Sequence, residues 1–242
     1  MGHNELLIAE ALRGVPRESY LLSVKFGAQR DPAGNWLGND TRPAAVKNAL
    51  AQTLNKLGTD YVDIYRPARL DPQVPIEDTV GAIVECIEAG WVRHVGLSEV
   101  GPETLRRASA VHPICDLQIE YALTTRNIER AVLPACRELG IGMTAYGVFG
   151  RGLLTGGWQP GVQAAGDFRA HTPRFQGEAG ERNLGVAARI AEVGAGFGLT
   201  PGQLVLGWVL AQGDDIVPLV GARRPERVTE AVAVLEAQLS VE

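Results

Sequence analysis

Three arginines gather where an apolar run near the C-terminal end gives way to a helical pattern. The segment VPLVGARRPERVTEA, residues 217–231, passes through Gly221 into a helix that we expect to begin near Pro225. The arginines are Arg223, Arg224 and Arg227. Positive charge in a first helical turn opposes the helix dipole, so the cluster loses stability unless an anion offsets it. The pattern favours a phosphomonoester site, and the alternative is a solvated basic patch satisfied by Glu226 and Glu230.

A tyrosine followed by a glycine-rich loop is a second candidate for ligand binding. The segment AYGVFGRGLLTGG covers residues 145–157. Tyr146 can stack on a planar ring, and the backbone N–H groups from Gly147 to Arg151, with the Arg151 cation, can receive a pyrophosphate. The alternative is a flexible loop after a core tyrosine, because the glycine pattern alone is weak.

Polar side chains also stand near the ends of three predicted strands. Lys25, inside LLSVKFG, can pair with a carboxylate, lower the pKa of a neighbouring hydroxyl, or extend into water. Ser98 and Gln118 end neighbouring strands, where a hydroxyl and an amide can hold a carboxamide by hydrogen bonds. Each of them alone more often caps a helix or satisfies a loop, and both interpretations stay open.

Alternating strands and helices position these groups. Apolar runs predict strands at 20–27, 61–65, 92–98, 114–120, 141–147 and 215–221. Helical periodicity predicts helices at 42–58, 75–90, 101–111, 127–139, 182–197, 201–211 and 224–239. Repeated strand–helix units indicate a parallel sheet, and no GxGxxG follows the first strand, which disfavours a Rossmann sheet. We therefore expect an α/β protein with one (β/α)8 TIM-type barrel over residues 1–242. It would lack the first strand, hold one further strand within 148–180, and carry its chemistry at the carboxyl ends of the strands.

Composition narrows the classes of function. The 242 residues carry a net charge of −5, which disfavours nucleic-acid binding, and no apolar run approaches the ~20 residues of a membrane span. The histidines are dispersed, so no metal site is expected. Cys86, Cys115 and Cys136 lack metal spacing, which indicates free, mostly buried thiols and a cytoplasmic protein. The first residues predict a helix capped by Asn4.

Several blocks of the sequence, in their order along the chain, resemble the aldo-keto reductase family. They are KLGTDYVDIYRPARLDP, IEDTVGAIVECIEAGWVRHVGLSEV, DLQIEYAL, VLPACRELGIGMTAYGVFGRGLLTGG and VPLVGARRPERVTEA. The resemblance covers essentially the whole chain. It implies an (α/β)8 barrel that binds NADP(H) and reduces a small carbonyl substrate, an aldehyde or a ketone, without metal or flavin.

The resemblance also implies roles for the candidate residues. Ser98 and Gln118 would hold the nicotinamide carboxamide, Tyr146 would stack on the nicotinamide ring, and Glu99 stands where the family often has asparagine. The pyrophosphate would be lined by Gly147, Val148, Phe149, Gly150, Arg151 and Leu153. The adenosine 2′-phosphate would be surrounded by Gly221, Ala222, Arg223 and Arg227, with Glu230 near the adenine and Ala231 in place of a frequent asparagine.

The catalytic set implied by the resemblance is an aspartate, a tyrosine, a lysine and a histidine. The tyrosine donates the proton, the lysine lowers its pKa, the aspartate orients the lysine, and the histidine polarises the carbonyl. Lys25 matches the lysine, Ala68 stands at the histidine position and Met1 at the tyrosine position, while the aspartate position lies before Met1. Two functions stay open: an NADP(H)-dependent reductase, and an NADP(H)-binding or regulatory protein of the same fold that turns over little.

The missing first strand has three explanations: a fragment of a longer polypeptide, a start codon placed late, or a homo-oligomer that covers the incomplete barrel edge. The loop at 157–180 gives no readable preference for one carbonyl substrate.

Overall fold

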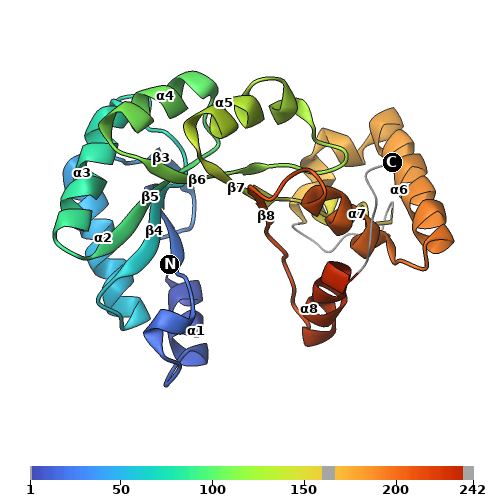
Figure 1. The fold of residues 1–242 in the computed structure, drawn as a ribbon, viewed down its shortest axis with the longest axis horizontal. Coiled ribbons are helices and arrows are strands. Elements are labelled where there is room, and N and C mark those ends of the chain that lie inside the picture. The colour runs from blue at the N-terminus through green and yellow to red at the C-terminus, as the bar shows by residue number, and fades with distance from the viewer. Residues whose placement is uncertain (1, 160–166, 237–242) are drawn as a thin grey trace. The chain divides into compact units, whose positions relative to one another are not determined.

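The computed structural model describes residues 2–159 and 167–236 (Figure 1). Contacts within the chain divide it into two compact units. The N-terminal unit comprises Met1–Ile119 and Glu129–Met143, and the C-terminal unit comprises Glu120–Ile128 and Thr144–Glu242.

Four parallel strands form the centre of the N-terminal unit, in the order β1-β4-β5-β6. They are β1 (Ser23–Phe26), β4 (Val62–Pro67), β5 (Val92–Ser98) and β6 (Ile114–Glu120). Their register places Lys25 beside Arg66 and Ser98 beside Gln118. The strands predicted at 20–27, 61–65, 92–98 and 114–120 are confirmed.

Amphipathic helices follow these strands along the chain: α2 (Pro43–Leu57), α3 (Ile76–Glu88), α4 (Pro102–Val111), η2 (Asn127–Arg130) and α5 (Val132–Leu139). Figure 1 shows α2, α3 and α4 along the outer side of the strands. Helix α2 buries Val46, Leu50 and Leu57 at helical spacing and ends at Gly58, whose φ of 66° suits glycine. The structure confirms the helices predicted at 42–58, 75–90, 101–111 and 127–139.

A buried carboxylate fixes the start of β4. The Asp63 side chain is 1% exposed and accepts hydrogen bonds from the Leu22 N–H at 2.8 Å and from Arg17 Nη2 at 2.6 Å. Arg93 Nη1 lies 3.3 Å from its second oxygen. Burial alone would raise the pKa of Asp63, but the Leu22 amide and the two arginines outweigh it and hold that pKa below its usual value. Asp63 therefore stays ionised and ties the segment before β1 to β4.

Two features of the N-terminal unit differ from the sequence-based expectation. A hairpin of β2 (Ala28–Arg30) and β3 (Trp36–Asn39) is present although no pattern predicts it. All of β2 is exposed, so the segment lacks the apolar alternation that marks a strand. Helix α1 (His3–Ala11) begins after Gly2 without a side-chain cap, followed by η1 (Arg17–Ser19). The prediction of Asn4 as the N-cap is wrong, because Asn4 lies inside the helix.

After Glu120–Ile128, the C-terminal unit continues from within β7 (Gly142–Tyr146), whose neighbour in the sheet is β8 (Ile216–Pro218). Just beyond β8, the Leu219 N–H donates to the Ala145 carbonyl at 2.7 Å. The helices are α6 (Gly177–Gly196), α7 (Pro201–Leu210), α8 (Pro225–Val232) and η6 (Ala233–Glu236). These elements confirm the predictions at 141–147, 182–197, 201–211, 215–221 and the described part of 224–239, of which 237–239 lie outside the described residues.

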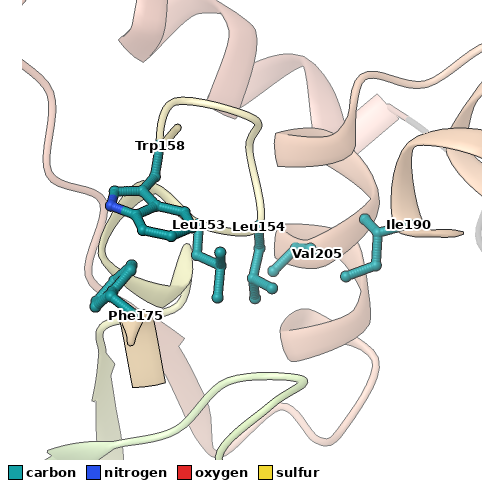
Figure 2. Close-up of a cluster of buried hydrophobic side chains, with 6 residues drawn as sticks. All are labelled: Leu153, Leu154, Trp158, Phe175, Ile190 and Val205. Atoms are coloured by element: carbon teal, nitrogen blue, oxygen red, sulfur yellow. The ribbon is translucent and has the colours of Figure 1, made fainter. Parts of the chain in front are cut away.

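A cluster of buried hydrophobic side chains holds the long loop after β7 against two helices (Figure 2). It contains Leu153, Leu154 and Trp158 from the loop, Phe175 from η5 (Pro173–Phe175), Ile190 from α6 and Val205 from α7. The loop also forms η3 (Gly150–Gly152) and η4 (Phe168–His171). The further strand expected in 148–180 is not found in the described part of that range, and residues 160–166 lie outside it.

The described residues offer neither a single membrane-spanning helix nor a group of metal-ligating side chains. No single helix there is long and apolar enough to cross a membrane, although α6 and α7, bent by 87° at their break, meet the length and composition as a pair. In 2–159 and 167–236, no three His, Cys, Asp or Glu side chains are grouped as metal ligands. The cysteines are free, and Cys86 and Cys136 are buried, which confirms the prediction of mostly buried thiols.

Candidate functional site

A pocket of about 760 Å³ in the C-terminal unit collects most of the residues expected to bind a cofactor. Its walls come from the turn after β7, the segment after β8, and the starts of α7 and α8. The expected residues that line it are Tyr146, Gly147, Val148, Phe149, Arg151, Gly221, Ala222, Arg223, Arg227 and Glu230. Residues more than 80 positions apart in the sequence therefore share one cavity, which is what a common ligand requires.

Two expected pyrophosphate contacts do not line this pocket. Gly150 is buried with a φ of 57°, and a Cβ at this position would come 2.9 Å from Leu154 Cγ. The Leu153 side chain is 2% exposed and belongs to the hydrophobic cluster of Figure 2. Both residues stabilise the turn and do not face the pocket: Gly150 adopts the left-handed backbone that the turn needs, and Leu153 anchors the turn in the hydrophobic cluster.

The sequence analysis missed the wall formed by the start of α7, which contributes Thr200, Pro201, Gly202 and Gln203. Thr200 Oγ1 accepts from the Gln203 N–H at 3.2 Å, and the Thr200 N–H donates to Gln203 Oε1 at 3.0 Å. This capping box was visible in the sequence as threonine, proline and glutamine in the order T-P-x-Q. It places a second helix N-terminus, with its partial positive charge, on the same pocket as α8.

Glu230 on α8 bonds to the start of α7 and also pairs with one of the arginines. Its Oε1 accepts from the Thr200 hydroxyl at 2.7 Å, and its Oε2 lies 2.7 Å from Arg227 Nη1. The Thr200 hydrogen bond and then the Arg227 bond lower the pKa of Glu230. Arg223 and Arg224 are exposed at the pocket, and among the described residues neither has an ion-pair partner. These two arginines can therefore neutralise an anionic ligand.

Arg151 lies at the pocket with a carboxylate partner of its own. Its Nη2 is 3.1 Å from Glu120 Oε2, while Arg174 Nη1 is 2.8 Å from Glu120 Oε1. Arg169 Nη1 donates to the Arg151 carbonyl at 3.3 Å, and Arg151 has a φ of 60°. The cation expected to face a pyrophosphate is thus shared with Glu120, and the ligand-facing part of this turn is chiefly backbone.

In the N-terminal unit, charged side chains gather at the carboxyl ends of β1 and β4. Arg66 is 1% exposed, with Nη1 2.8 Å from Asp116 Oδ2 and Nη2 2.5 Å from Ser23 Oγ. Gly96 leaves room for this pair, because a Cβ there would come 2.5 Å from Asp116 Oδ1. Burial, followed by the positive charges of Arg66 and Arg69, lowers the pKa of Lys25 to about 8, although Glu99 and Asp116 oppose the shift. The Lys25 side chain is itself exposed and lies among charges of both signs.

Ser98 and Gln118, expected to act together, are register partners on β5 and β6. Ser98 is fully buried, and its hydroxyl accepts from Arg69 Nη1 at 3.4 Å. The Glu99 N–H donates to the Gln118 carbonyl at 3.1 Å. Glu99 has a φ of 56°, a left-handed conformation that asparagine adopts more readily than glutamate. This backbone geometry explains why an asparagine suits the position where the resemblance places it.

Ala68 follows β4 directly, between Pro67 and Arg69. Its N–H donates to the Phe26 carbonyl at 2.8 Å, and its carbonyl accepts from Arg69 Nη1 at 2.7 Å. The side chain is a methyl group, so Ala68 offers a ligand no hydrogen bond from its side chain. Met1, at the expected tyrosine position, lies outside the described residues.

Fold and site together define a class of protein. Parallel β/α units with lysine, serine and glutamine near the carboxyl ends of their strands are typical of a TIM-type barrel. The pocket of the C-terminal unit adds two helix N-termini and exposed arginines. The chain belongs to the aldo/keto reductase family, whose family model matches residues 1–242.

Curated relatives agree with this assignment. A probable aldo-keto reductase 1 of Glycine max is 40% identical over 238 residues, which cover 98% of this chain and 68% of the relative. The aldo-keto reductase yakc [NADP(+)] of Schizosaccharomyces pombe is 40% identical over 228 residues, which cover 93% of this chain and 67% of the relative. The chain thus spans about two thirds of the length of both relatives.

Solved structures give the same fold. The glycerol dehydrogenase AKR11B4 from Gluconobacter oxydans superposes with a TM-score of 0.91 at 26% identity, over 99% of this chain and 74% of that chain. The thermostable aldo-keto reductase Tm1743, in complex with the inhibitor epalrestat, superposes with a TM-score of 0.75 at 26% identity, with the same coverage. The expected α/β fold of TIM-barrel type is therefore confirmed.

Proposed function

We propose that this protein is an NADP(H)-dependent oxidoreductase that reduces aldehyde or ketone groups by hydride transfer. The observation that carries the proposal is the pocket of the C-terminal unit, where Arg223 and Arg224 lack a carboxylate partner among the described residues and stand at the start of α8. Membership of the aldo/keto reductase family, and the NADP(+) in the name of the Schizosaccharomyces pombe relative, support it.

The residues of the pocket fit an adenine dinucleotide with an extra phosphate. The start of α7 and the backbone after Tyr146 offer N–H groups to a pyrophosphate, and the exposed guanidinium groups of Arg223 and Arg224 suit a phosphomonoester. In the N-terminal unit, the paired Ser98 and Gln118 provide a hydroxyl and an amide for a carboxamide.

The chemistry is divided between cofactor and chain. Reduced nicotinamide, when bound, supplies a hydride to the carbonyl carbon. The chain stabilises the negative charge that then develops on the carbonyl oxygen. Lys25 can contribute because it still carries a positive charge at pH 7: its pKa, although lowered to about 8, lies above that pH, and the charge declines as the pH rises through 8.

An alternative function rests on Ala68. Its methyl group supplies no donor at the end of β4. A protein of this kind can hold NADP(H) and turn over little, acting as a binding or regulatory protein. The free thiols support a reducing, cytoplasmic location for either function.

Two measurements separate these functions. NADPH is titrated by its fluorescence, and the consumption of NADPH is then followed at its absorbance band with a panel of aldehydes and ketones. Binding with turnover supports the reductase, whereas tight binding without turnover refutes it and supports the binding protein. The lack of any NADPH binding contradicts both.

A further inference from the structure

Carbonyl reduction is helped by a positive group near the carbonyl oxygen. As the carbonyl carbon receives a hydride, the C–O π electron pair moves to the oxygen, which takes one proton from water to give the alcohol. A donor fixed at that oxygen in advance lowers the barrier, because the charge develops there. Ala68, which directly follows β4, has only a methyl side chain and cannot be that donor.

Arg66 lies two residues before Ala68 and Arg69 directly after it, and the surroundings of the two arginines differ. Arg66 is 1% exposed and is held by Asp116 at 2.8 Å and Ser23 at 2.5 Å. The Asp116 carboxylate already balances the charge of Arg66, and the Ser23 hydroxyl takes a second of its N–H groups. Arg66 therefore affects the site through its charge, which is one of the causes that lower the pKa of Lys25.

Arg69 has the opposite properties. Its side chain is exposed, and among the described residues it has no ion-pair partner. One nitrogen, Nη1, donates to the Ala68 carbonyl at 2.7 Å and to Ser98 Oγ at 3.4 Å. Those bonds fix the guanidinium over the ends of β4 and β5, while Nε and Nη2 donate to no acceptor in the described part of the chain.

Charge near Lys25 supports the same placement. The positive charge of Arg69 is one of the causes that lower the pKa of Lys25, so the two cations lie within electrostatic reach of each other. Glu99 and Asp116 offset part of the repulsion between these cations, and an oxygen that gains negative charge near them offsets more of it.

We propose that Arg69 is the residue that polarises the carbonyl of the substrate, through the N–H groups that the Ala68 carbonyl and Ser98 leave open. The inference rests on the proposed reductase function. A guanidinium is suited to this role because it keeps its charge at every physiological pH and offers several N–H groups in one plane. The substrate needs no charge of its own, since the contact is made to the carbonyl oxygen.

The test compares Arg69→Gln and Arg69→Lys with the unsubstituted protein, using the neutral substrate 4-nitrobenzaldehyde. Arg69→Gln is expected to lower kcat about 10²-fold, the usual effect of removing one donor to a developing oxyanion, with the Kd of NADPH unchanged. Arg69→Lys keeps a cation and recovers part of the rate. Millimolar guanidinium added to Arg69→Ala also restores part of the rate, which a purely structural role would not permit.

The control variant is Arg107→Gln, an exposed arginine on α4 that is paired with Glu77 at 2.7 Å, and it leaves kcat unchanged. A kcat for Arg69→Gln equal to that of the unsubstituted protein overturns the proposal. So does a fall in rate matched by an equal loss of NADPH affinity. An effect confined to the Michaelis constant for a carboxylate-bearing benzaldehyde also overturns it, because Arg69 would then bind an anionic substituent. If the unsubstituted protein binds NADPH without turnover, the reductase function fails first and the role of Arg69 fails with it.

Discussion

Replacing Arg223 by alanine tests the cofactor assignment most directly, because NADPH and NADH differ only in the 2′-phosphate. Arg223 is exposed at the pocket and has no carboxylate partner among the described residues, so its charge is available to that phosphate. The variant therefore removes a ligand contact without leaving a buried carboxylate unpaired.

The magnitude follows from the exposure of the side chain. A hydrogen bond to a charged group contributes about 1.5–3 kcal/mol, and screening by solvent favours the lower end of that range for an exposed arginine. A loss of about 1.5 kcal/mol weakens binding roughly tenfold. Arg224→Ala is expected to behave in the same way. The Kd of NADH is expected to stay roughly constant in both variants, because NADH carries no 2′-phosphate for these arginines to neutralise.

Fluorescence titration of both cofactors provides the assay. The ratio of the two dissociation constants is measured for Arg223→Ala and for the control Arg182→Ala, an exposed arginine on α6 whose ion pair with Glu178 lies outside the pocket. Higher salt should reduce the preference of the unsubstituted protein for NADPH, because exposed charges are screened. Equal weakening of NADPH and NADH by Arg223→Ala would refute the 2′-phosphate assignment.

Three substitutions test the fold around the site. Asp63→Asn should lower the free energy of unfolding by about 3–5 kcal/mol at pH 7, because Arg17 loses a buried carboxylate. The pKa of Asp63 is lower in the folded than in the unfolded protein. The stability that ionised Asp63 contributes is therefore present above the unfolded pKa of about 3.9 and is lost as pH falls through the folded pKa. In urea titrations, the stability difference between the variant and the unsubstituted protein should be smaller at pH 3 than at pH 7. Gly96→Ala should destabilise by about 1–3 kcal/mol in the same titration, because its Cβ meets Asp116. Glu99→Asn should raise the melting temperature slightly, by relief of about 1 kcal/mol of backbone strain.

The sequence predicts the elements that bury apolar residues and misses those that do not. Strand β4 is buried along nearly its whole length, so its apolar run is readable without a structure. Strand β2 is exposed throughout, and nothing in its composition separates it from a loop. The start of α7 carried a readable capping signal, but only its position beside α8 shows that it lines a pocket.

The candidate site divides in the same way. Ser98 and Gln118 could be paired from the sequence because strand ends in a parallel sheet meet at one edge, and the register confirms their adjacency. The partners of the arginines could not be predicted. Glu120 binds Arg151 and Arg174, which follow it by 31 and 54 residues, and Asp116 binds Arg66 from another strand. Contacts between residues so far apart in the sequence depend on the tertiary fold, not on local periodicity.

The carboxylate partners determine which arginines are available to a ligand. Arg17, Arg66 and Arg227 each meet a carboxylate within 2.8 Å, and their charge is used inside the protein. Arg69 and Arg223 have no such partner in the described chain, although each lies at a strand end or helix start where the proposed ligand would carry negative charge. Water solvates an exposed cation well, so the lack of a carboxylate partner is by itself weak evidence for a binding site. The position of an unpaired arginine at these two sites is what makes it informative. The two assignments can be tested separately. Loss of Arg223 should change the preference for NADPH over NADH and leave kcat unchanged, whereas loss of Arg69 should lower kcat and leave that preference unchanged.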